Sequence, residues 1–277
     1  MSIKSPASVR HGDQSFTGSI PDIYDDYMVP LKFQVCAVDM ARRVAALAPY
    51  RVLETAAGSG VVTRALAPQL PAGARYTATD LNPSMLERAK SQQPHADQLS
   101  WHTADMMELP FEDRSFEVVC CQFGVMFLPD KLQGYREALR VLAPGGHYVF
   151  SVWDHIDHND FARSVTAAAA RVFPDDPPDF MPRIPHGYHD VAAISATLRE
   201  AGFKKVEAAM LIAEGRADSA ATVAKAFCQG TPLRNTIEDR GADLDHVTAR
   251  IAQDLERQLG KGPVRGKLQA RVFTASA

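Results

Sequence analysis

The segment Arg51–Leu66 constrains the fold of this chain more than any other stretch. It begins with a short apolar run, Val52-Leu53, which predicts a buried strand that ends at the acid Glu54. A turn of small residues follows, with glycines at 58 and 60, and residues 61–66 have the spacing of a helix. A strand that turns through glycines into a helix leaves backbone N–H groups open to a ligand. The segment therefore predicts a ligand-binding loop.

Stretches typical of strands and helices alternate through the rest of the chain. Further strands are predicted at 75–79, 99–103, 116–123, 147–153, 203–212 and 268–274. Helices are predicted at 31–47, from Asn82-Pro83 onward, and at 129–142, 159–172, 190–201, 219–227 and 244–259. Because parallel strands need long crossovers, this order predicts an α/β fold with a doubly wound, mostly parallel seven-stranded sheet.

Acidic and amide side chains follow several of these strands, where ligands bind to open α/β sheets. Asp80 is the twentieth residue after Gly60, which is the position of a carboxylate that accepts hydrogen bonds from a ribose diol. Asp105, after the third strand, is placed to bind the exocyclic amine of an adenine. Leu81 and Met106 would then cover the two faces of the base. Either acid alone could equally be a cap or loop residue, but their combination with the glycine turn favours a nucleoside site.

Two cofactors suit this geometry. A dinucleotide favours G-x-G-x-x-G or G-x-G-x-x-A, whereas Thr63 stands at the last position here. S-adenosylmethionine has no pyrophosphate and carries a cationic amine and a sulfonium, which suit the negative charge of Glu54. These residues favour S-adenosylmethionine and leave an NAD(P)-dependent oxidoreductase as the less favoured alternative.

At this point the sequence resembles the class I S-adenosylmethionine-dependent methyltransferases, of the ubiquinone/menaquinone-biosynthesis type (methyltransferase type 11/25). The first stretch resembles the E/D-x-G-x-G-x-G motif of that family, with Ala56 in place of its first glycine. The stretches that carry the resemblance are Glu54–Gly60, Asp80–Leu86, Ala104–Phe111, Phe116–Val119 and Leu139–Gly146. The resemblance implies a seven-stranded sheet whose last strand is antiparallel.

The resemblance also implies roles for individual residues. Gly58 and Gly60 would contact the methionine part of the cofactor, Tyr24 would close over it, and Gln122 would lie near the methyl donor. The predicted cofactor-binding residues are Tyr24, Glu54, Ala56, Gly58, Gly60, Asp80, Leu81, Met85, Asp105, Met106 and Gln122.

The domain organisation expected from these patterns is a single methyltransferase domain over residues 1–277. Residues 1–48 would form an N-terminal helical cover, of which about the first 20 are expected to be loose. Residues 49–153 would form the cofactor-binding core, and 154–277 the substrate-side helices and the final two strands.

The expected function is transfer of a methyl group from S-adenosylmethionine to a small-molecule acceptor by in-line displacement, leaving S-adenosylhomocysteine. A base is needed only for a protonated acceptor. No catalytic residue is identified and no metal site is expected. Four histidines and a tyrosine are candidate bases, but loop or surface positions are expected for the histidines. These residues are His155, His158, His186, His189 and Tyr188. A protein that binds the cofactor without transferring a methyl group is a further alternative.

Composition and charge argue against several classes of binding partner. The net charge of −3 argues against a nucleic-acid surface. No apolar stretch is long enough to span a membrane, and the N-terminus lacks the apolar run of a signal peptide. The 4 cysteines lack metal-site spacing, and the adjacent Cys120 and Cys121 are expected to be buried thiols. The expected location is the cytoplasm, without stable membrane insertion, and a homodimer is left open.

Overall fold

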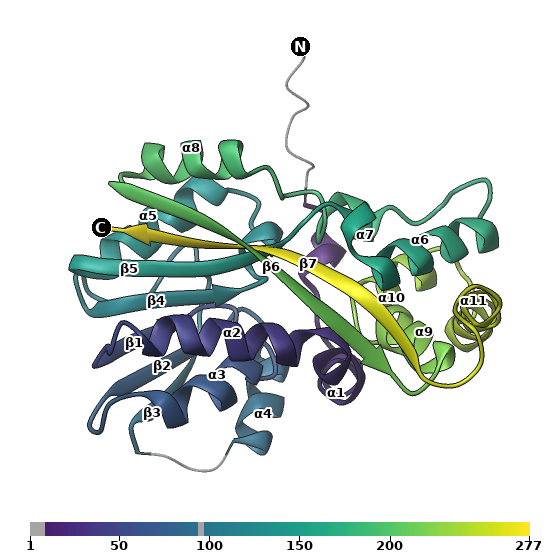
Figure 1. Cartoon of the computed structure of the whole chain (residues 1–277), viewed down its shortest axis with the longest axis horizontal. Coiled ribbons are helices and arrows are strands. Elements are labelled where there is room, and N and C mark those ends of the chain that lie inside the picture. The colour runs from purple at the N-terminus through teal and green to yellow at the C-terminus, as the bar shows by residue number, and fades with distance from the viewer. Residues whose placement is uncertain (1–8, 94–96) are drawn as a thin grey trace.

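The computed structural model describes residues 9–93 and 97–277. In this part of the chain one sheet has the strand order β3-β2-β1-β4-β5-β7-β6 (Figure 1). Its strands are β1 (Arg51–Glu54), β2 (Arg75–Asp80), β3 (Leu99–Thr103), β4 (Phe116–Gln122), β5 (Leu142–Trp153), β6 (Lys205–Ala217) and β7 (Val264–Ser276). The predicted strands are therefore confirmed, and the last two are longer than expected.

The direction of the strands follows from their pairing. β1 pairs in parallel with both β2 and β4, which places the ends of these strands at one edge of the sheet. β7 is antiparallel to both of its neighbours, β5 and β6. The mostly parallel sheet with an antiparallel last strand is thus confirmed.

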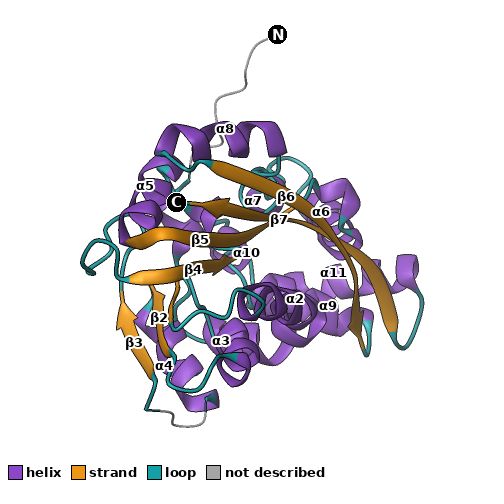
Figure 2. Ribbon diagram, turned by 60° about the vertical axis from the view of Figure 1, so that its left-hand side comes forward, coloured by secondary structure: helices purple, strands orange, loops and turns teal. Residues whose placement is uncertain are grey.

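Helices cover both faces of the sheet, with α2 and α3 on one side and α5 and α8 on the other (Figure 2). The helices are α1 (Ile20–Ile23), α2 (Gln34–Ala45), α3 (Val61–Leu66), α4 (Pro83–Gln92), α5 (Lys131–Val141), α6 (Asp160–Val172), α7 (Phe180–Arg183), α8 (Val191–Ala201), α9 (Ala220–Gln229), α10 (Leu233–Glu238) and α11 (Leu244–Leu259). The short helices α7 and α10 were not predicted, because each is only a few residues long and follows prolines.

The two faces have separate apolar cores. Cys120 belongs to the core that contains α2 and α3, whereas the adjacent Cys121 belongs to the core beneath α5 and α8. Side chains alternate along a strand, so two neighbours in β4 must point to opposite faces. Cys120 and Cys121 are buried, as expected from the sequence, and so are the other two cysteines, Cys36 and Cys228.

The N-terminal segment differs from its expectation. Residues 1–8 lie outside the described part of the chain, but a loose segment is wrong for residues 9–19. His11–Gln14 form a turn of 3₁₀-helix, and the Asp13 carboxylate, 4% exposed, pairs with Arg183 at 2.7 Å. The partner of this acid is 170 residues away in the sequence, and for this reason its burial could not be inferred locally.

A π-helical segment, Tyr24–Phe33, joins α1 to α2 and contains Pro30. The long β6–β7 pair extends beyond the other strands towards a group of helices formed by α6, α9, α10 and α11 (Figure 1). None of the helices in the described part of the chain has the length and apolar character needed to cross a membrane.

Candidate functional site

The turn after β1 is held in an unusual backbone conformation. Ala56, Gly58 and Gly60 have φ values of 52°, 56° and 82°, which lie in the left-handed region. Glycine adopts this region without a steric penalty, but alanine does so at a cost. The left-handed Gly60 is the N-cap of α3, so the turn directs backbone N–H groups towards the carboxyl edge of the sheet.

The structure also explains how alanine is tolerated at the first position of the motif. Gly124 follows β4 and lies against the turn, and a Cβ atom placed on it would be 2.5 Å from the Cβ of Ala56. The absent side chain of Gly124 therefore leaves the space that the Ala56 methyl group occupies.

Asp80 binds the glycine turn from the end of β2. Its Oδ2 accepts a hydrogen bond from the Gly58 N–H at 2.8 Å, and its Oδ1 accepts one from the Asn82 N–H at 2.8 Å. Burial raises the pKa of this carboxyl group, while these backbone hydrogen bonds act in the opposite direction. Oδ1 also accepts a longer hydrogen bond from Asn82 Nδ2 at 3.4 Å, whereas Oδ2 has a second lone pair, so Asp80 can shape the turn and still accept a hydrogen bond from a ligand through Oδ2.

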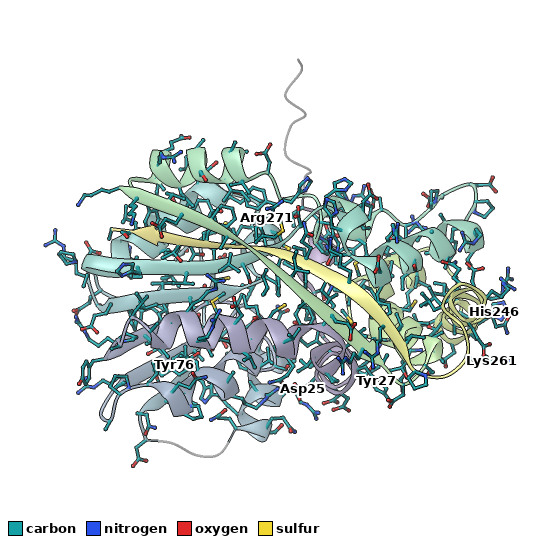
Figure 3. The ribbon with its side chains drawn as sticks, viewed as in Figure 1. Asp25, Tyr27, Tyr76, His246, Lys261 and Arg271 are labelled. Atoms are coloured by element: carbon teal, nitrogen blue, oxygen red, sulfur yellow. The ribbon has the colours of Figure 1, made fainter. Side chains whose placement is uncertain are left out.

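The N-terminal cover binds the same turn through Asp25, which follows α1 (Figure 3). Its carboxylate accepts hydrogen bonds from Ser59 Oγ at 2.7 Å and from Arg64 Nη2 at 2.8 Å. Arg88 of α4 contacts Asp25 as well, with Nε 3.1 Å from Oδ2. These partly buried contacts place the neighbouring Tyr24 over the pocket.

These elements enclose a pocket of about 1040 Å³, including its open mouth. Nine of the predicted cofactor residues line it: Tyr24, Ala56, Gly58, Asp80, Leu81, Met85, Asp105, Met106 and Gln122. A Cβ atom on Gly58 would lie 3.4 Å from Met85 Cε and 4.0 Å from the Tyr24 ring. The glycine therefore keeps a gap open between these two side chains, as a bound ligand would require.

The other two predicted residues do not line the pocket. Glu54 is 1% exposed, and its Oε2 accepts hydrogen bonds from Thr63 Oγ1 and Tyr76 OH, each at 2.5 Å. Burial raises the pKa of Glu54 to about 7, against the effect of these two hydrogen bonds. Gly60 supports the turn from behind, where an added Cβ would lie 3.0 Å from Ala89 Cβ. A direct contact of either residue with a cofactor stays a prediction.

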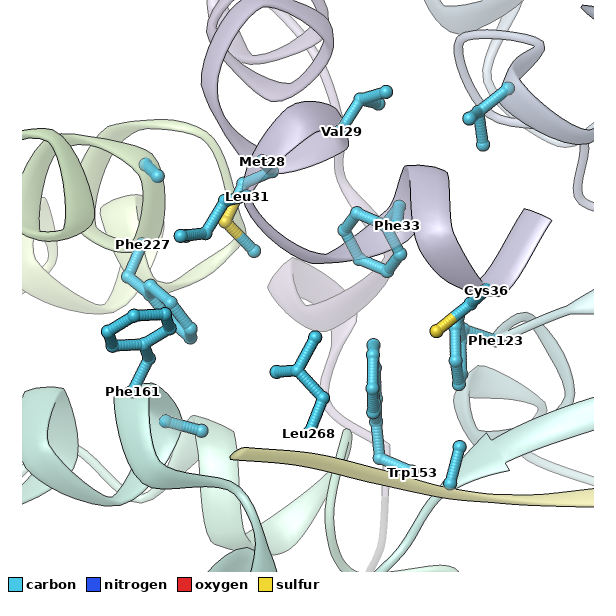
Figure 4. Packing of buried hydrophobic residues seen from close by; sticks show 14 of the residues in the cluster. Met28, Val29, Leu31, Phe33, Cys36, Phe123, Trp153, Phe161, Phe227 and Leu268 are labelled. Atoms are coloured by element: carbon cyan, nitrogen blue, oxygen red, sulfur yellow. The ribbon is translucent and has the colours of Figure 1, made fainter. Parts of the chain in front are cut away.

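The rest of the pocket lining is mostly apolar and largely aromatic. The sequence suggests an apolar acceptor pocket made by aromatic and apolar residues of the late segments, and three of these, Trp153, Phe180 and Met181, line the pocket. The other three, Phe161, Phe173 and Phe227, are not among its lining residues. Its apolar side chains are Phe16, Met28, Phe33, Phe123, Phe127, Leu128, Trp153, Phe180 and Met181. Phe123 stacks on Trp153 with ring centroids 3.8 Å apart (Figure 4). Phe123 directly follows β4 and Trp153 is the last residue of the neighbouring strand β5. A lysine, Lys32, also lines this pocket, and it is the one lysine among the described lining residues. No motif in the sequence had pointed to it.

The five side chains that the sequence offers as candidate bases are not among the residues that line this pocket. His155 and His158 are exposed, and His186 lies in the turn after α7, which agrees with the loop or surface positions expected. His186 is nevertheless buried. His186 Nδ1 lies 2.8 Å from the Asp154 carbonyl oxygen, and burial lowers its pKa to about 3. The hydroxyl groups of Tyr188 and Tyr135 lie 3.0 Å apart. In the described part of the chain, no cluster of three or more acidic, histidine or cysteine side chains is arranged to hold a metal ion.

Comparison with known proteins agrees with this geometry. A family model described as "Methyltransferase domain" matches residues 53–150. Demethylmenaquinone methyltransferase of Clavibacter sepedonicus is 30% identical over 63% of this chain and 74% of that protein. The ubiquinone/menaquinone biosynthesis C-methyltransferase UbiE of Paracoccus denitrificans is 27% identical over 74% of this chain and 86% of its own length.

The fold is shared with solved structures of low sequence identity. YcgJ protein of Bacillus subtilis superimposes with a TM-score of 0.56 at 15% identity, over 87% of this chain and 98% of that one.

Proposed function

The chain belongs to the class I S-adenosylmethionine-dependent methyltransferases, in the ubiquinone/menaquinone-biosynthesis-like branch, and from this premise we propose that its acceptor is an apolar, ring-bearing small molecule. As a member of this family it is an enzyme that uses S-adenosylmethionine as methyl donor. The observation that carries the acceptor proposal is that one pocket is lined both by the acids Asp80 and Asp105 and by a large set of aromatic side chains.

The acids of the pocket lining suit the cofactor. Asp80 retains acceptor capacity for a ribose diol, and Asp105, whose Oδ1 accepts a hydrogen bond from the Met107 N–H at 2.8 Å, has a second oxygen for an adenine amine. Leu81 and Met106 provide apolar surface for the base. We propose that the predicted residues lining the pocket bind the cofactor in this way, and that Glu54 and Gly60 act by shaping the turn.

The aromatic part suits the acceptor. Stacked rings such as Phe123 and Trp153 bind flat apolar molecules through dispersion and burial of apolar surface. The names of the two relatives place their reactions in quinone chemistry, which is consistent with a ring-bearing acceptor.

Catalysis in such a site depends on positioning. The bound cofactor supplies a methyl carbon that a sulfonium activates. The chain must hold the acceptor in line with that carbon and exclude water, which aligned binding in an apolar pocket does. Tyr24 and Phe33, both from the N-terminal cover, line the pocket and stack with ring centroids 5.0 Å apart, so the cover contributes part of the aromatic lining.

Two measurements test this function. Calorimetry should detect micromolar binding of S-adenosylmethionine and S-adenosylhomocysteine but not of NAD. Reduced 1,4-naphthoquinone should then accept a methyl group, whereas ethanolamine, which is small and polar, should not. Transfer to ethanolamine alone would refute the acceptor proposal without affecting the assignment of the cofactor.

Several expectations from the sequence stay predictions. These are the division at residues 48 and 153, the cytoplasmic location, the lack of nucleic-acid binding and the homodimer. Sedimentation of the purified chain would decide the last of these.

A further inference from the structure

Lys32 occupies an unusual position in the acceptor part of the pocket. It lies in the π-helical segment before α2 and is only 3% exposed. Its Nζ is 3.8 Å from the centroid of the Trp153 ring and 5.3 Å from that of Phe227. The Phe33 ring is 5.6 Å away, and Figure 4 shows these three aromatic side chains in the same core. The amine is thus surrounded by rings and lines the pocket.

Among the described residues, Lys32 Nζ forms no hydrogen bond or ion pair, and its charge is met only by the faces of the aromatic rings. Lys131, in contrast, donates a hydrogen bond to the Leu128 carbonyl oxygen at 2.6 Å, and Lys225 donates one to Tyr27 OH at 3.0 Å. A buried amine without a polar partner has unused hydrogen-bonding capacity that a ligand in the pocket can satisfy.

The titratable groups that act on this amine are neutral near pH 7. Cys36, one turn further along, has its thiol pKa raised to about 12 by burial. His186, whose ring centroid is 6.1 Å from that of Trp153, is neutral because burial and the Lys32 charge lower its pKa. Burial lowers the pKa of Lys32 itself to about 7. At neutral pH the amine therefore has a lone pair available for a substantial part of the time.

We propose that Lys32 is the general base of this enzyme and removes the proton from an acidic hydroxyl group on the aromatic acceptor. This inference rests on the proposed function, because it requires a ring-bearing acceptor in the aromatic part of the pocket. An ammonium acceptor fits less well, since it would add a positive charge beside Lys32 and the sulfonium.

The proton transfer balances in atoms and charge. The acceptor O–H bond breaks and a new N–H bond forms at Lys32 Nζ, which gives an ammonium–oxyanion pair inside the pocket. The electron pair left on oxygen, or on the ring carbon conjugated to it, forms the bond to the methyl carbon, whose former bonding pair stays on sulfur. Lys32 then releases its proton to water at the mouth of the pocket. After attack through carbon, the ring proton leaves to water and the ring oxygen takes up one proton from water, which restores the hydroxyl group, so that one proton is released overall.

A second polar group faces the same space. Gln122 lines the pocket, and its Oε1 is buried without a hydrogen-bond partner among the described residues. Its Nε2 is 3.5 Å from the Phe33 carbonyl oxygen, which orients the amide. The free oxygen can accept a hydrogen bond from a further hydroxyl group of the acceptor, and this would hold the ring beside Lys32.

The first test measures the ionisation of Lys32 without an acceptor. The full chain, labelled with ¹³C-lysine and bound to S-adenosylhomocysteine, is titrated by NMR between pH 5.5 and 10. The Lys32 resonance is assigned as the one that is lost in Lys32→Met. A midpoint near 7 is expected, and a resonance that stays in its protonated position up to pH 10 would overturn the inference.

The second test measures methyl transfer to reduced 1,4-naphthoquinone as a function of pH. Lys32→Met should lower kcat about 100-fold or more, the usual effect of losing a general base, with little change in KM. Lys32→Arg should be equally slow, because it keeps the charge but cannot accept a proton. The matched control is Lys225→Met, which removes a lysine that contacts Tyr27 outside the pocket and should leave kcat unchanged.

The outcomes separate the two proposals. Wild-type activity that rises with pH through an ionisation near 7, and that is lost in Lys32→Met while calorimetric binding of S-adenosylhomocysteine is kept, supports the base. Equal rates for wild type and Lys32→Met, or recovery by Lys32→Arg, overturn the role of Lys32 alone. A wild-type enzyme that binds the cofactor but methylates no hydroxyl-bearing ring would overturn the acceptor proposal and this inference together.

Discussion

Replacing Lys32 by methionine should stabilise the folded protein while impairing the reaction. Methionine has a similar length and fills the same aromatic surroundings without a charge. The lysine pKa falls from 10.5 to about 7 on folding, which corresponds to about 5 kcal/mol at about 1.4 kcal/mol per pKa unit. Methionine carries no charge and avoids this penalty. At pH 7 the folded wild type is half protonated, so nearly the whole penalty applies and we expect Lys32→Met to gain about 4 kcal/mol.

The lowered pKa of Lys32 also predicts how the stability difference between the two proteins changes with pH. Between pH 7 and 10.5 the unfolded chain holds the Lys32 proton and the folded chain has released it, so the stability that this group contributes rises with pH in that window. The Lys32→Met protein has no titratable group at this position, so its stability lacks this pH-dependent contribution. Its advantage over wild type should therefore shrink by about 1.4 kcal/mol per pH unit above pH 7 and vanish near pH 10.5.

Urea denaturation of both proteins at pH 6, 7 and 9, followed by tryptophan fluorescence, measures the difference in the free energy of unfolding. Lys225→Met serves as the control and should not be stabilised, because its amine has a hydrogen-bond partner in Tyr27. A Lys32→Met protein less stable than wild type at pH 7, or a difference independent of pH, would refute the reasoning.

Three further predictions concern the turn after β1. Asp80→Ala should weaken S-adenosylmethionine binding by about 1–3 kcal/mol in calorimetry, and an unchanged affinity would remove the ribose assignment. Glu54→Gln should stabilise the fold by about 3 kcal/mol above pH 7, since the folded chain holds the Glu54 proton between pH 4.5 and about 7 after the unfolded chain has released it. Denaturation at pH 4 and pH 8 checks this, and an equal gain at both values would contradict it. Gly124→Ala should destabilise the fold by about 1–3 kcal/mol through the contact with Ala56, and Ala56→Gly in the same chain should recover part of the loss. Strictly additive effects in a double-mutant cycle would mean that the two side chains do not compete for space.

The cofactor side of the pocket could be predicted largely from local sequence. Gly58 and Asp80 lie 22 residues apart, and parallel pairing of β1 with β2 brings the ends of these strands together. Any sequence that makes two adjacent parallel strands must place the residues after them at one edge, and strand positions can be identified from apolar runs and breaks.

The direction in which an individual side chain of this region points could be learned only from the structure. Glu54 was expected beside the cofactor because it ends a strand, but its side chain points to Tyr76 and Thr63 in the interior. A strand position does not say which face of a sheet will be buried by the following helix, and Thr63 of α3 supplies the donor that holds the carboxyl group there.

The sequence by itself determined the order of the elements, the ligand-binding turn and the acids that follow the strands, because these depend on short-range patterns. Only the tertiary structure decided the acceptor side. Lys32 meets Trp153 and Phe227 from segments more than 100 residues away, and its pKa depends on the loss of water that their packing causes. Desolvation is a property of the assembled core, so a lysine in a helical stretch gives no local sign of it.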